Sequence, residues 1–147
     1  MTRKILFILL TALVTSLSVQ PQEVVKVGAE LTACYFPLLE GKRVAVMSNQ
    51  TGMAGDEHLV DLLLSHNHNL VGIFSPEHGF RGTADAGEHV SSSVDEKTGI
   101  PIWSLYGSGN GKPSTEKMKA FDILVFDLQD VGLRFYTYYA SMARLMD

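Results

Sequence analysis

The chain lacks several features that would place it in a specialised class. One cysteine among 147 residues allows neither an internal disulfide nor an all-thiolate metal site. No apolar run reaches the roughly eighteen uninterrupted residues of a membrane span, which argues against a transmembrane anchor. Lys and Arg (12) are outnumbered by Asp and Glu (16), and no basic run exceeds two residues, so nucleic-acid binding has no electrostatic basis. With 46% hydrophobic residues, the composition is that of one ordinary globular domain.

The first eighteen residues have the pattern of a secretory signal peptide. Met1–Lys4 is a short cationic start, Ile5–Val14 is an apolar run too short to span a bilayer, and Ser16 and Ser18 place small residues before a cleavage at Val19. A buried N-terminal helix is the alternative, but it does not explain the charged start. We therefore expect residues 1–18 to be removed and the protein to be exported, to the periplasm or beyond the cell.

Cys34 ends a short match to a lipobox. Charged residues separate it from the apolar run, whereas a lipidated cysteine follows such a run directly. We interpret Cys34 as a small buried hydrophobe.

Apolar runs alternate with helical segments along the remaining chain. Strands are predicted at 43–48, 70–75, 100–106 and 121–127, and helices at 58–64, 114–120 and 136–146. Pro101 favours an edge position for its strand, and Ser114 is a suitable helix N-cap. The run at 121–127 is the clearest candidate for a buried parallel strand.

This alternation predicts an α/β, Rossmann-like three-layer fold with a mostly parallel sheet. Strands 43–48, 70–75 and 121–127 are expected to be parallel neighbours. The last helix has no Gly or Pro stop signal before Asp147, so we expect the fold to be incomplete at the C-terminus.

Three of the predicted strands end in polar clusters. These clusters are 48–52, 75–79 and 127–130. In parallel sheets, ligands bind beyond the carboxyl ends of the strands, so the three clusters predict a site at that edge.

Glu77 is the most informative titratable residue of these clusters. It follows a strand and Pro76, and it lies close in sequence to His78 and Arg81. Partial burial would raise its pKa and suit it to act as a general acid. Pairing with Arg81 would instead make it a structural carboxylate. The residues alone leave both interpretations open.

A second polar group follows the last strand. It comprises Asp127, Gln129, Asp130 and Arg134, of which Arg134 can hold a carboxylate bidentately. An internal salt bridge is the alternative role for Arg134. The neighbouring aromatic residues Phe135, Tyr136 and Tyr138 are of a kind found more often in cores than as sugar platforms.

Two other patterns carry little chemistry. His78, Asp85, Glu88 and His89 match no common zinc spacing. The glycine-rich stretch 107–114 departs from a phosphate-binding loop in both its glycine spacing and the residue after Lys112. We therefore predict no metal site and no cofactor.

Four motifs in fixed order resemble the exo-β-N-acetylmuramidase family of glycoside hydrolases. The resemblance spans about residues 25–147, and its motifs lie at 41–52, 74–82, 106–113 and 127–138. It implies a Rossmann-like N-terminal catalytic domain, of which residues 19–147 are the first part, and a smaller C-terminal domain that this sequence does not contain. Family members remove a terminal N-acetylmuramic acid (MurNAc) residue from the non-reducing end of peptidoglycan fragments.

The resemblance also implies roles for individual residues. Glu77 corresponds to the catalytic acid. Glycoside hydrolysis usually needs a second group, for which Asp127 or Asp130 is the candidate carboxylate and the 2-acetamido group of MurNAc is the alternative. The candidate substrate-binding residues are Asn49, Gln50, His78, Arg81, Gln129, Arg134 and Tyr136. The expected partner is a MurNAc-GlcNAc glycan from peptidoglycan.

Two other functions remain open at this stage. One is an exported, non-catalytic binding module with a ligand at the strand ends. The other is a metal-assisted hydrolase that uses His78, Asp85 and His89.

Overall fold

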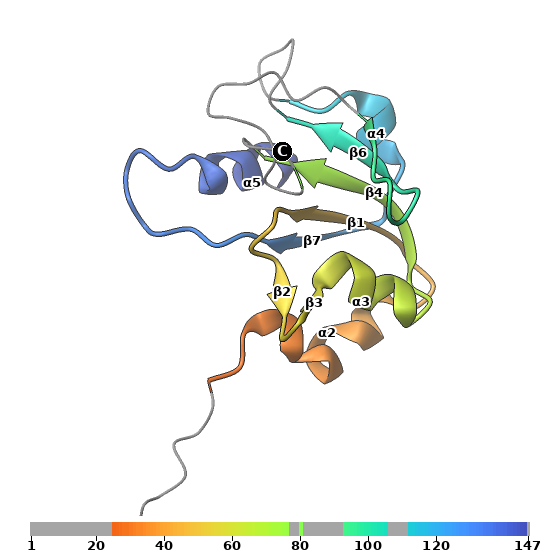
Figure 1. Cartoon of the computed structure of the whole chain (residues 1–147). Helices are drawn as coiled ribbons and strands as arrows, with labels where there is room; N and C mark the ends of the chain where they lie inside the picture. The colour runs from red at the N-terminus through yellow and green to blue at the C-terminus, as the bar shows by residue number, and fades with distance from the viewer. Residues whose placement is uncertain (1–24, 77–79, 81–92, 106–111, 147) are drawn as a thin grey trace, which may run out of the picture.

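The computed structural model describes residues 25–76, 80, 93–105 and 112–146 of the chain. Figure 1 shows a sheet with helices on both sides. Its elements, in chain order, are η1 Gly28–Glu30, α2 Thr32–Leu39, β1 Arg43–Ser48, β2 Met53–Ala54, β3 Glu57–His58, α3 Leu59–Ser65, β4 Asn69–Ser75, β5 Ser93–Val94, β6 Pro101–Ser104, α4 Thr115–Lys119, β7 Ile123–Asp127 and α5 Tyr138–Met146.

A mostly parallel sheet forms the centre of the described structure. Its order is β5-β6-β4-β1-β7, and β2 and β3 form a separate antiparallel pair. Strand β1 pairs in parallel with β4 on one side and with β7 on the other. The predicted parallel arrangement of these three strands, and the α/β fold class, are confirmed.

The position of β6 differs from the sequence prediction. It lies between β4 and the two-residue strand β5, so the prediction of an edge position was wrong. Pro101 is tolerated because it is the first residue of β6, and the parallel ladder with β4 begins only at Ile102. Antiparallel pairing to β5 joins Pro101 to Val94.

Strand β7 is less buried than its apolar sequence indicates. All five of its residues are only partly buried. It ends the sheet next to β1, and within the described residues no strand pairs with its other side. The prediction that this is the clearest buried strand was therefore wrong, because apolar content does not tell a central strand from an outer one.

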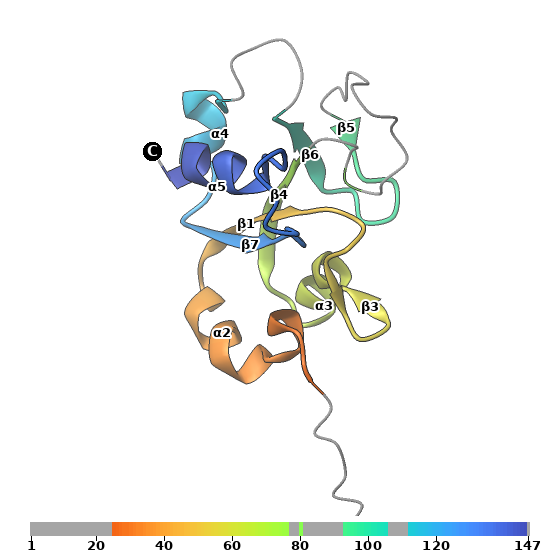
Figure 2. The same cartoon turned by 90° about the vertical axis from the view of Figure 1, so that its left-hand side faces the viewer.

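Helices cover both faces of the sheet, as a three-layer fold requires (Figures 1 and 2). On the first face, α2 and α3 pack on alternate residues of β1, including Val44 and Val46. On the second face, Leu145 of α5 and Met118 of α4 pack with Ala45 and Met47 of the same strand. The alternation of buried residues along β1 thus serves two separate cores.

The helix starts follow their capping residues. Ser114 accepts a hydrogen bond from the backbone N–H of Lys117 and caps α4, as predicted. The predicted helices at 58–64 and 136–146 are confirmed as α3 and α5.

Cys34 is exposed on α2, so its prediction as a buried residue was wrong. No helix in the described ranges is long and apolar enough to cross a membrane.

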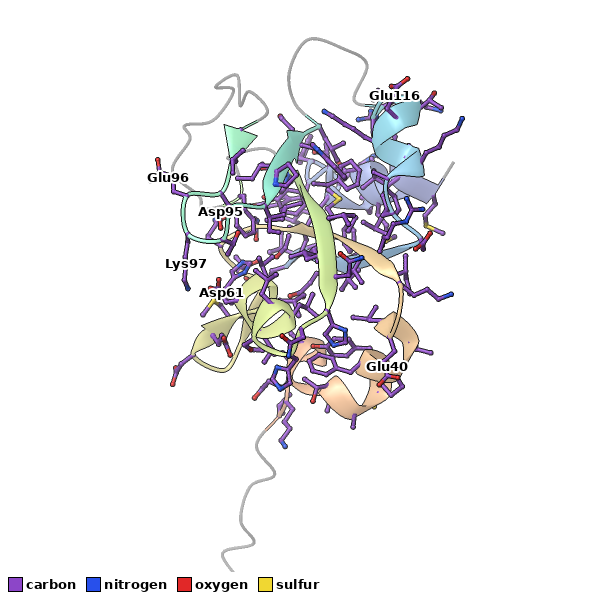
Figure 3. All side chains as sticks on the ribbon, turned by 90° about the vertical axis from the view of Figure 1, so that its right-hand side faces the viewer. Glu40, Asp61, Asp95, Glu96, Lys97 and Glu116 are labelled. Carbon is purple, nitrogen blue, oxygen red and sulfur yellow. The ribbon has the colours of Figure 1, made fainter. Side chains whose placement is uncertain are left out.

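Two ion pairs fasten elements away from the carboxyl edge of the sheet. Arg43, at the start of β1, donates to Asp122 at 2.7 Å. The hydrogen bonds from Arg43 lower the pKa of Asp122 to about 2. Lys97 contacts Asp61 of α3 at 2.6 Å, and Figure 3 shows the two side chains pointing toward each other.

Gly72 of β4 leaves space for an aromatic ring. A β-carbon added there would overlap three atoms of the Trp103 indole. We expect Gly72→Ala to lower the free energy of unfolding by about 1–3 kcal/mol, because the rigid ring must be displaced. Urea denaturation measures the change.

The matched control is Gly28→Ala. A β-carbon at Gly28 meets no atom within 4 Å, so its effect should stay within about 0.5 kcal/mol. Equal stability of the two variants would contradict the close packing of Trp103 on Gly72.

Candidate active site

The parallel pairing brings the polar ends of three strands to one edge. Ser48 of β1 pairs in register with Asp127 of β7, and β4 ends on the other side of β1 at Ser75. Ser48 and Ser75 are fully buried. Glu77, His78 and Arg81, which follow β4, lie outside the described residues, as do Asp85, Glu88 and His89.

The turn after β1 is built on Asn49. This side chain is 2% exposed, and its Oδ1 accepts hydrogen bonds from the backbone N–H of Thr51 at 2.9 Å and from the Thr51 hydroxyl at 2.7 Å. Its Nδ2 lies 3.5 Å from the Tyr138 hydroxyl. Asn49 therefore organises the strand end, while Gln50 next to it is exposed.

Thr51 connects this turn to the chain after β7. Its Oγ1 accepts a hydrogen bond from the backbone N–H of Gln129 at 3.3 Å. Two segments 78 residues apart in sequence thus meet at the carboxyl edge. The predicted site residues Asn49 and Gln129 are brought close together through Thr51.

The His58 side chain contacts three segments, namely the turn at Asn49, the start of α3 at Val60 and the chain after β4 at Phe80. Its Nδ1 accepts from the backbone N–H of Val60 at 3.2 Å, and its Nε2 lies 2.8 Å from the carbonyl oxygen of Asn49. The first bond requires an unprotonated Nδ1, so Nε2 carries the proton and donates it to Asn49. The ring also packs edge-to-face on Phe80 at 4.9 Å.

Phe80 fixes one point in the segment that follows β4. Its side chain is 3% exposed and belongs to the core beneath β1. Since Phe80 is three residues after Glu77, the contact with His58 ties the chain beyond β4 to the turn after β1.

Asp127 is the perturbed carboxyl of the described site. Burial is the main cause that raises the pKa of Asp127 above its usual value. Its Oδ2 is buried and has no hydrogen-bond partner. A β-carbon on Gly52 would lie 3.1 Å from this oxygen. Burial, with the negative charge of Asp127 as a smaller cause, also raises the pKa of Tyr35.

The loop after β7 is exposed. Asp130 Oδ1 accepts from the backbone N–H of Gly132 at 2.7 Å, and Gly132 has a positive φ of 69°. Such an Asx turn commits one Asp130 oxygen to the backbone. Arg134 is exposed, and Phe135 and Tyr136 are 92% and 44% exposed. The expectation that these aromatic residues belong to the core is therefore wrong for Phe135 and Tyr136.

Several residues near this edge could not be predicted as site residues from the sequence. His58 precedes a helix, Tyr35 lies in α2, and Gly52 follows a polar turn. Only their position in space joins them to Asp127. Among the residues that the structure describes, no group of three His, Cys, Asp or Glu side chains is placed to hold a metal ion.

Asp127→Asn is expected to stabilise the protein at neutral pH. A carboxyl whose pKa is raised by folding binds its proton more tightly in the folded state. Its ionised form therefore costs stability above the folded pKa, and this cost disappears as pH falls below the unfolded value of about 3.9. We expect a higher Tm for the variant at pH 7, and equal Tm values near pH 3, in thermal melts followed by circular dichroism.

The control for this result is Asp130→Asn, whose residue is exposed and whose Oδ1 accepts from the backbone. This variant should show no stabilisation at pH 7. A lower Tm for Asp127→Asn at pH 7 would contradict the account of Asp127 as a carboxyl that burial destabilises.

His58→Ala is expected to lower the free energy of unfolding by about 1–3 kcal/mol. The variant loses a helix N-cap and a buried hydrogen bond, each worth about 1 kcal/mol. His58→Asn can still cap α3 and should lose less. Urea denaturation of both variants separates the cap from the contacts to Asn49 and Phe80, and equal losses would contradict a capping role.

Fold and site together define an α/β protein with a perturbed carboxyl and a polar cluster at the carboxyl edge of a mostly parallel sheet. The family model described as exo-β-N-acetylmuramidase NamZ, N-terminal, matches residues 44–147. The chain belongs to this family.

Three relatives have names or structures to compare. The chain is 47% identical over 115 residues to the peptidoglycan β-N-acetylmuramidase NamZ of Bacillus subtilis (strain 168), which covers 77% of this chain and 28% of that protein. Two DUF1343 family proteins from Bacteroides fragilis NCTC 9343 have crystal structures. The first is 57% identical to this chain, with a TM-score of 0.69. The match covers 82% of this chain and 30% of the Bacteroides protein. The second is 38% identical, with a TM-score of 0.74, and the match covers 86% of this chain and 32% of the Bacteroides protein. The chain thus spans about a third or less of each relative.

Proposed function

We propose that this protein is a glycosidase that releases terminal β-linked MurNAc from the non-reducing end of peptidoglycan fragments. The 47% identity to a peptidoglycan β-N-acetylmuramidase is the observation that carries the proposal. The perturbed Asp127 at the carboxyl edge supports it, because glycoside hydrolysis uses carboxyl groups in different ionisation states. A role in cell-wall turnover follows from this activity.

Glu77 acts as the general acid in this proposal. It protonates the glycosidic oxygen as the bond to the leaving sugar breaks. Asp127 is favoured over Asp130 as the second carboxyl group, because Asp127 is partly buried whereas Asp130 is exposed and holds a turn. Arg81 and Arg134 are the candidates to bind the lactyl carboxylate of MurNAc.

The direct test uses chromogenic glycosides. We expect the protein to release 4-nitrophenol from the β-glycoside of MurNAc and not from that of N-acetylglucosamine, which lacks the lactyl group. Equal rates on both would contradict the proposed substrate. No release from either would remove the proposed activity from this protein.

We also propose that the protein is exported and that residues 1–18 are removed. The cationic start, the apolar run and the small residues before Val19 support this proposal. N-terminal sequencing of exported material should begin within a few residues of Val19. Material that retains Met1 would contradict it.

A further inference from the structure

A small cavity lies beneath the end of β7, on the face of the sheet that α2 and α3 cover. It measures about 180 Å³ and is lined by Gly28, Ala29, Tyr35, Leu59, Val125, Phe126 and Asp127. Pockets that enclose a drug-sized ligand measure roughly 300–1,000 Å³. This cavity therefore has room for a substituent of a sugar rather than for a whole saccharide.

The chemistry of the lining is mostly apolar. Asp127 and Tyr35 are its polar side chains, and the side chains of Ala29, Leu59 and Val125 form an apolar wall. The Tyr35 hydroxyl already donates to the carbonyl oxygen of Ala29 at 2.7 Å. Both polar side chains therefore offer oxygen acceptors to a ligand, which suits a group that brings an N–H or O–H donor and an apolar end.

MurNAc carries two substituents that distinguish it from glucose, and the cavity suits only one of them. Among the described residues that line it, none is Lys, Arg or His. A lactyl carboxylate would enter without a cation and next to Asp127, which is unfavourable. An acetamido group is neutral, and it combines an N–H donor with a methyl group. Its carbonyl oxygen must face solvent, because the Tyr35 hydroxyl is committed to Ala29 and a carboxylate does not donate.

We infer that the cavity formed by η1, α2, α3 and the end of β7 binds the 2-acetamido group of the terminal sugar. Its methyl group packs against Ala29, Leu59 and Val125, and its N–H donates to the Asp127 carboxyl. This inference rests on the proposed function and adds an assignment for Tyr35 and Ala29. The acetamido and lactyl groups then bind at different places, because the lactyl carboxylate needs a cation elsewhere at the carboxyl edge.

The test measures binding by isothermal titration calorimetry of methyl β-glycosides to the unaltered protein. The two compounds are the glycoside of MurNAc and the glycoside of its analogue with a hydroxyl in place of the acetamido group. Burial of a methyl group and one hydrogen bond predict roughly tenfold tighter binding of MurNAc than of the hydroxyl analogue.

A variant pair locates the effect. Ala29→Leu fills the cavity and should bind MurNAc and the hydroxyl analogue equally. Ala33→Leu makes the same change at an exposed position of α2 and should keep the tenfold preference. Circular dichroism checks that both variants fold, and the comparison of the two glycosides on the unaltered protein decides the matter if Ala29→Leu does not fold.

The outcomes separate the two proposals. Equal binding of MurNAc and its hydroxyl analogue would overturn the cavity assignment and leave the proposed function standing. Retention of the preference in folded Ala29→Leu would do the same. Binding of none of the compounds would overturn the proposed function and this inference with it.

Discussion

Glu77→Gln should lower the rate of hydrolysis of a MurNAc glycoside by about 10²–10⁴-fold while the protein stays folded. The substitution keeps the size of the side chain and removes the proton that a general acid supplies. The loss should appear in kcat, because proton transfer to the leaving oxygen belongs to the transition state and not to binding. Steady-state kinetics with the chromogenic substrate measure it.

A matched control is Glu96→Gln. Glu96 is exposed in the turn between β5 and β6, where Figure 3 shows it pointing away from the sheet. This variant should retain the activity of the unaltered protein. Near-normal kcat in a folded Glu77→Gln protein would exclude Glu77 as the acid and leave the proposed substrate unaffected.

Phe74→Ala should lower the free energy of unfolding by about 3–5 kcal/mol. The side chain is fully buried near the C-terminal end of β4. Its ring packs edge-to-face on Trp103 at 5.0 Å and on Phe121 at 5.8 Å. Truncation leaves a cavity in the core under α4 and α5 and removes two aromatic contacts. Urea denaturation measures the difference.

Phe135→Ala removes the same side chain from a position that is 92% exposed. Its free energy of unfolding should differ from that of the unaltered protein by no more than about 0.5 kcal/mol. A loss below about 1 kcal/mol for Phe74→Ala would contradict its place in the core.

The parallel centre of the sheet could be predicted because its strands have continuous apolar sequences. Arg43–Ser48 and Asn69–Ser75 are buried on both faces, and this leaves a strong sequence signal. The outer strands could not be ordered in the same way. The two residues of β5 are too few for any periodic signal. Because β5 pairs antiparallel with β6, the edge position belongs to β5 and not to β6.

The candidate site, like the sheet, could be predicted from the sequence only in part. Asp127 ends a strand, and Asn49 and Gln129 come one and two residues after strand ends, so the rule that parallel strands end at one edge was enough to group them. Roles were harder to predict than positions. Asn49 has the amide of a ligand-binding residue, but its Oδ1 is taken up by Thr51. His58, Tyr35 and Gly52 reach Asp127 only through tertiary folding, which no local pattern encodes.

The close approach of Gly72 to Trp103 has a consequence for spectroscopy. Trp103 is the chain's single tryptophan, and it packs in the core on the α4 and α5 side with Phe74. Its fluorescence therefore reports on the core between the sheet and the helices α4 and α5. The cavity near Asp127 lies on the other face of the sheet, so a sugar bound there should leave the emission maximum unchanged, whereas unfolding should shift it to longer wavelength. One intrinsic probe thus distinguishes loss of the fold from occupation of the site.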